Sequence, residues 1–237
     1  MTPELKALTI AAAFVGFLHT ILGPDHYLPF IMISWARKWS LAKTAFITFL
    51  CGIGHIASSI VLGMIGVAAG VALEKLELVE STRGSIAAWL LIAFGLVYMI
   101  WGIRSAYKNK PHTHPHIHLD ANEHLHEHTH HCEHTHIHDT NAPINITPWA
   151  LFIIFVFGPC EVLIPFLMYP AAEINFSGVI IVTSVFALAT IATMLTVVML
   201  AVKGVNFLPL KPLQKYSHAV AGAAIFLCGL AIQFLGL

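Results

Sequence analysis

The chain has 237 residues, of which 57% are hydrophobic and only 10% are charged. Soluble domains carry about 25% charged residues, so this composition excludes an ordinary soluble protein and indicates an integral membrane protein. The 12 basic and 12 acidic residues balance, so the charge gives no reason to expect a nucleic acid partner.

Six apolar segments are long enough to cross a bilayer, which takes about 20 residues. They are expected at 7–34, 44–73, 84–106, 147–171, 178–203 and 216–236. Most basic residues fall on one side of this arrangement: Arg37, Lys38, Lys43, Arg104, Lys108, Lys110, Lys203, Lys211 and Lys215. The positive-inside rule then predicts that both termini lie outside and that the loop after the third span is cytoplasmic. We expect a multi-pass protein of the bacterial inner (cytoplasmic) membrane, in contact with lipid.

The first span contains the sequence His19-Thr-Ile-Leu-Gly-Pro-Asp25-His26. Pro24 has no amide hydrogen and its ring clashes with the carbonyl four residues back, so the helix is expected to break there. Ionisable side chains are costly within a span and usually serve a function. We therefore expect His19, Asp25 and His26 to handle a metal ion; the alternative is two core histidines beside a helix cap.

The second span places Cys51 and His55 four residues apart, on one face of a helix. The surrounding glycines and serines permit close approach of a neighbouring helix. His55 is expected to be a ligand or a pore residue, and the alternative is a hydrogen-bonded packing histidine.

The fourth span repeats the pattern of the first, because Gly158-Pro-Cys160-Glu161 resembles Gly23-Pro-Asp25-His26 at an offset of 135 residues. Each repeat holds three spans, an odd number, so the second repeat must be inverted, as in many secondary transporters. The predicted fold is an all-α integral membrane protein with six transmembrane helices in two inverted three-helix repeats, 1–110 and 147–237. Helices 1 and 4 are interrupted at Gly-Pro, and Cys160 and Glu161 are expected to extend the metal site. The alternative is two unrelated kinks.

The segment 111–146 between the repeats is rich in histidine and lacks the apolar periodicity of a core. It is expected to be a disordered cytoplasmic loop that buffers transition metals through neutral imidazoles. Its histidines are His112, His114, His116, His118, His124, His126, His128, His130, His131, His134, His136 and His138. The alternative is a solvated linker without a metal role.

The stretch His19-x5-Asp25-His26 resembles the His-x4/5-Asp-His signature of bacterial nickel/cobalt transporters. The Gly-Pro-Cys sequence at 158–160 and the histidine-rich loop are also similar to the branch that includes nickel/cobalt efflux permeases and urease-accessory membrane permeases. This resemblance implies a six-span transporter of Ni²⁺ or Co²⁺ in which His19, Asp25 and His26 handle the metal.

The predicted function is a secondary transporter that moves a divalent transition metal through a site at the repeat interface, with protons as a natural coupling ion. Two alternatives remain open: a membrane thiol–disulfide electron carrier that uses Cys160, and a transporter of another metal such as Zn²⁺. The sequence offers no enzyme motif, and we expect neither enzymatic activity nor a required cofactor. It leaves the oligomeric state open, including a homo-oligomer.

Overall fold

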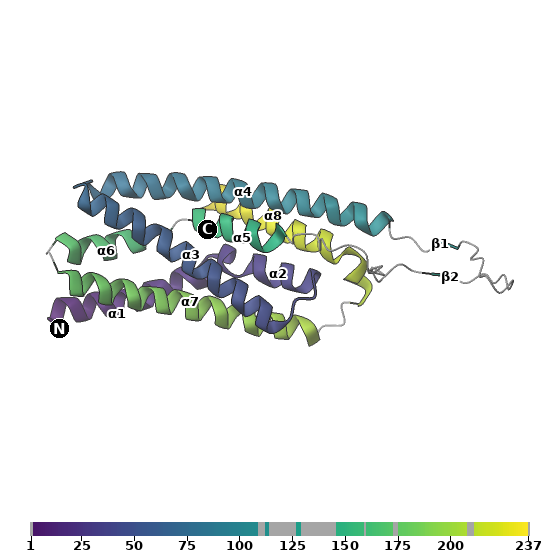
Figure 1. Cartoon of the computed structure of the whole chain (residues 1–237), viewed down its shortest axis with the longest axis horizontal. Coiled ribbons are helices and arrows are strands. Elements are labelled where there is room, and N and C mark those ends of the chain that lie inside the picture. Colours follow the sequence, from purple (N-terminus) through teal and green to yellow (C-terminus); the bar gives the residue numbers. More distant parts are fainter. Residues whose placement is uncertain are drawn as a thin grey trace, which may run out of the picture.

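The computed structural model describes residues 2–108, 112–113, 127–128, 146–158, 160–172, 175–207 and 211–236. The longer segments among them are helical and form one elongated bundle (Figure 1). The helices are α1 (Pro3–Leu22), η1 (Pro24–His26), α2 (Leu28–Ala36), α3 (Leu41–Ala68), α4 (Leu73–Lys108), α5 (Ile146–Phe157), α6 (Leu163–Ala172), α7 (Phe176–Phe207), η2 (Lys211–Tyr216) and α8 (Ser217–Leu235).

The helices are long and apolar enough to cross a membrane in five places within the described residues. These candidate spans are Pro3–Leu22, Leu41–Ala68, Leu73–Tyr107, Phe176–Val205 and Leu213–Leu235. Large apolar side chains such as Phe14 (60% exposed) and Leu188 (71% exposed) cover the outer surface, as contact with lipid requires. The chain is therefore a multi-pass membrane protein whose described membrane portion is helical, while the six-span inverted repeat stays a prediction.

The first predicted span is interrupted where Pro24 indicated. Helix α1 ends at Leu22, a short 3₁₀ turn spans Pro24–His26, and α2 begins at Leu28. The amides that follow the break find partners close by in the chain, since His26 N donates to the Gly23 carbonyl. The break is thus built from local hydrogen bonds.

The predicted fourth span is two short helices, α5 and α6, with a non-helical connection between Phe157 and Leu163. Helix α5 is apolar but has only 12 residues, too few to cross a bilayer alone. Both helices pack against α3, and α6 also packs against α7. The sequence therefore located this interruption correctly.

The predicted third span, 84–106, is too short. Helix α4 begins at Leu73 and continues to Lys108. Its first three turns carry charged residues, which a search for apolar runs leaves out. One of them, Glu80, is buried and paired with Arg83 one turn later, so the helix continues through this polar stretch.

Helix α4 lies along α8 with very close backbone approach. A Cβ atom on Gly95 or Gly102 would collide with the backbone of α8, at Phe226 and Ala219 respectively. Small residues of this kind allow membrane helices to pack closely. This pair of helices forms one side of the bundle in Figure 1.

The predicted histidine-rich loop lies mostly outside the described residues. Its described parts are two two-residue strands, β1 (His112–Thr113) and β2 (Glu127–His128). They pair antiparallel, with His112 opposite His128. The predictions of disorder and of metal buffering for the remaining histidines of 111–146 stay predictions.

Candidate metal site between the interrupted helices

Three histidines from separate elements come together in the interior of the bundle. His19 lies near the end of α1, His26 ends η1, and His55 lies in the middle of α3. One ring nitrogen of each lies within 4.8 Å of those of the other two. The ring centroids are 4.6 Å apart for His19 and His26, and 5.0 Å apart for His26 and His55. The fold thus brings together His19 and His55, which are 36 residues apart in the sequence.

The ring of His26 is fixed by its own turn. Its Nδ1 lies 2.9 Å from Asp25 Oδ1 and 3.2 Å from the Gly23 carbonyl oxygen. Both neighbours are acceptors, so Nδ1 carries the proton and donates. The Nε2 atom is buried and has no hydrogen-bond partner among the described residues. In this tautomer Nε2 presents a lone pair, the arrangement seen when a carboxylate orients a metal-binding histidine.

The ring of His55 lies against the second interruption. It packs against the ring of Phe155, in the last turn of α5, with the two ring centroids 6.3 Å apart. Its Nε2 is buried and has no partner within the described part of the chain. A Cβ atom on Gly158 would lie 3.1 Å from His55 Nδ1, so glycine allows the end of α5 to approach this ring.

Cys160 lies beside the cluster. Its thiol is completely buried, and Sγ is 4.0 Å from His19 Nε2. The three-histidine group does not include it. Asp25 also lies outside the group and contacts it through His26. The predicted ligand set thus divides into His19, His26 and His55 at the centre, with Asp25 and Cys160 in contact with those histidines.

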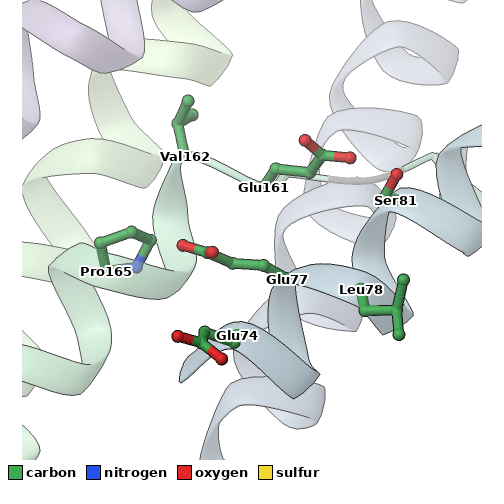
Figure 2. Close-up of a pocket in the computed structure, with 7 residues that line it drawn as sticks. All are labelled: Glu74, Glu77, Leu78, Ser81, Glu161, Val162 and Pro165. Carbon is green, nitrogen blue, oxygen red and sulfur yellow. The ribbon is translucent and has the colours of Figure 1, made fainter. Parts of the chain in front are cut away.

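Glu161 does not extend the site as the sequence predicted. Its side chain is exposed and lines an open pocket together with Glu74 and Glu77 from the start of α4 (Figure 2). The turn after Cys160 therefore directs the two neighbouring side chains in different directions, Cys160 inward and Glu161 outward.

Two polar residues near the site, the buried Glu80 and the half-buried Arg83, are not singled out by the sequence. Glu80 is 0% exposed, and its carboxylate contacts Arg83 and Ser59. Arg83 reaches across to the Val156 carbonyl oxygen at 2.8 Å. An acidic residue three positions before an arginine, at the start of an apolar run, is the signal that could have indicated them.

The other described cysteines, Cys51 and Cys228, are buried within the main hydrophobic core. Neither they nor Cys160 forms a disulfide, and Cys132 lies outside the described residues. Cys51 shares the α3 face with His55 as predicted from its spacing, but packs as an apolar side chain.

These observations define a class: a membrane protein with a helical transmembrane portion, in which the breaks of two interrupted helices meet at a cluster of three histidines in the interior. A family model described as "Cytochrome C biogenesis protein transmembrane region" matches residues 28–231. The chain belongs to this family of membrane proteins. No curated protein and no solved structure matches the chain.

The family match overturns the resemblance to nickel/cobalt transporters. That resemblance depended on one eight-residue motif, a Gly-Pro-Cys sequence and a histidine-rich loop, whereas the family model covers most of the membrane portion. The match begins at residue 28 and so does not include His19, Asp25 or His26. The motif at the first helix break therefore occurs in a chain whose family is not the one that the motif resembles.

Proposed function

We propose that this protein binds a divalent transition-metal ion at His19, His26 and His55 and carries it across the membrane. The single observation that supports this function is the convergence of three imidazoles from α1, η1 and α3, with their ring nitrogens within 4.8 Å. Neutral imidazole is a good ligand for borderline metals such as Zn²⁺. The scaffold is that of the cytochrome c biogenesis transmembrane family.

The spacing of the nitrogens suits a small adjustment on binding. Zn–N bonds of about 2.0–2.1 Å in a tetrahedral site place the nitrogens about 3.4 Å apart. The nitrogens, which lie within 4.8 Å of one another, therefore need to approach by at most about 1.4 Å to bind one ion. Two of the three histidines, His26 and His55, have a buried Nε2 atom with no hydrogen-bond partner among the described residues. Leaving buried polar atoms without partners is unfavourable by about 1–3 kcal/mol each, and a metal ion would relieve this.

The surroundings favour release as well as binding. The bound ion would have three neutral ligands. The charged Asp25 would contact His26 Nδ1 and not the ion itself. Few charged ligands make a site that can let an ion leave, as conduction requires. The carboxylates of Glu74, Glu77 and Glu161 around the open pocket would raise the local concentration of cations at that surface.

A second candidate function is thiol–disulfide transfer, which the family favours. Cys160 at the second break, 4.0 Å from an imidazole, is the observation that supports it. Such transfer needs a second thiol to form or receive the disulfide. The equivalent position in the first break is Asp25, so the partner would have to be another cysteine or a separate protein.

Transport assays in sealed proteoliposomes test the leading proposal. A fluorescent indicator trapped inside reports Zn²⁺ entry, and His26→Ala together with His55→Ala should reduce the rate to that of empty liposomes. His218→Ala is the matched control, because His218 lies on α8, bonds Tyr98 of α4 and is not part of the three-histidine group. Normal Zn²⁺ entry in the double variant would exclude the histidine site as the pathway.

A further inference from the structure

Side chains from α3 and α4 gather on the second break, where α5 ends. Arg83 Nη2 donates to the Val156 carbonyl oxygen and to Ser58 Oγ, each at 2.8 Å. Its Nη1 bonds Glu80 Oε1 at 2.5 Å. The Ser59 hydroxyl donates to Glu80 Oε2 at 3.3 Å. We call this group the α4 clamp; it consists of Glu80 and Arg83 of α4 together with Ser58 and Ser59 of α3.

Two members of the α4 clamp bond the two backbone groups that would bond each other in an unbroken helix. In an unbroken α-helix the Cys160 amide would donate to the Val156 carbonyl, four residues earlier. In this protein the carbonyl accepts from Arg83, and the amide donates to Ser59 Oγ at 3.2 Å. Glu80 joins Arg83 to Ser59, so the two separated backbone groups are linked through side chains.

This arrangement is unfavourable unless every member is present. Glu80 is completely buried and the Arg83 side chain is 17% exposed. Burying a carboxylate and a guanidinium removes hydration that their attraction alone seldom replaces, and breaking such a pair leaves an uncompensated charge. Apolar residues would hold two helices together as well, so stability alone gives no reason for this group.

We propose that Arg83 is a positioning residue that keeps the second break open and thereby holds the Cys160 side chain against His19. With the Val156 carbonyl and the Cys160 amide both occupied, the chain cannot close into a helical turn at this point. The turn instead directs Cys160 inward, where Sγ lies 4.0 Å from His19 Nε2. Release of the clamp frees both backbone groups to bond each other, which rotates Cys160 out of its buried place. The inference concerns the position of Cys160 and does not depend on which cargo the site takes.

Alkylation of Cys160 by a small maleimide tests the inference. The variant Cys51→Ser/Cys132→Ser/Cys228→Ser leaves Cys160 as the one thiol, and its complete burial predicts slow reaction in detergent-purified full-length protein. Arg83→Gln removes the bonds to Val156 and Glu80, and should speed alkylation by about tenfold or more. Arg83→Lys keeps the charge but cannot reach three acceptors, so it should give an intermediate rate.

Ser59→Ala is the second variant, because it frees the Cys160 amide without leaving a charge unpaired. It should also speed alkylation, and it decides the matter if Arg83→Gln does not fold. Thr82→Ala is the matched control: Thr82 lies beside Arg83 on α4, and its hydroxyl donates to the Leu78 carbonyl of its own helix. Unchanged alkylation in folded Arg83→Gln or Ser59→Ala protein would overturn the proposal, as would an equal increase in Thr82→Ala.

Discussion

The two helix breaks meet at the same histidines but are held in different ways. The first, between Leu22 and Leu28, is held by hydrogen bonds within its own turn, among Gly23, Asp25 and His26. The second, between Phe157 and Leu163, has its backbone held by Arg83 and Ser59 from two other helices. The first break is therefore a rigid support for a ligand, while the second depends on tertiary contacts that can be released.

The largest effect is expected at the rigid break. Asp25→Asn keeps the shape of the side chain but removes the charge that orients His26, so Zn²⁺ affinity should fall by about 10–100-fold. Isothermal titration of purified protein with Zn²⁺ measures this change. Glu161→Gln, which removes a carboxylate one residue from Cys160 but outside the cluster, is the control. Equal affinity in Asp25→Asn and the unaltered protein would mean that the first turn orients no ligand.

A smaller effect is expected at the second break. Cys160 contacts His19 but lies outside the three-histidine group, so Cys160→Ser should keep Zn²⁺ entry within a few-fold of normal. The liposome assay used for the histidine variants measures the rate. Loss of Zn²⁺ entry comparable to that in His26→Ala would make Cys160 an essential part of the site. The same variant also tests the family-based alternative, since thiol–disulfide transfer through Cys160 would stop completely.

The smallest effect on the maximal rate is expected outside both breaks. The segment 111–146 has no apolar pattern that could join the core. Deleting 112–138 should leave the maximal rate of Zn²⁺ entry unchanged and alter mainly the concentration at which it saturates. Complete loss of entry by a deletion variant that still folds and inserts would show that the loop belongs to the pathway.

The sequence predicted the features that depend on local chemistry. Pro24 indicated the first break because proline removes an amide donor from a helix. The repeated Gly-Pro located the second break, and the cost of a buried imidazole singled out His55. Each of these features depends only on neighbouring residues and on the apolar surroundings.

Features that depend on distant contacts were missed or misjudged. Glu161 was grouped with Cys160 because the two are adjacent, but the turn exposes one and buries the other. Glu80 and Arg83 are not singled out by the sequence, since their partners Ser59 and Val156 come from other helices. The family was misassigned because eight residues around His19 weighed more than the apolar pattern of the remaining chain.

X-ray absorption spectroscopy of the purified protein loaded with one equivalent of Zn²⁺ tests the central claim most directly. To keep loop histidines from contributing, the measurement uses the variant that lacks 112–138. The account predicts three imidazole nitrogens at about 2.0–2.1 Å from the metal. It also predicts that the imidazole signal disappears in His26→Ala/His55→Ala but persists in His218→Ala. A metal bound mainly by oxygen, or an imidazole signal unchanged in the double variant, would contradict the assignment of the site.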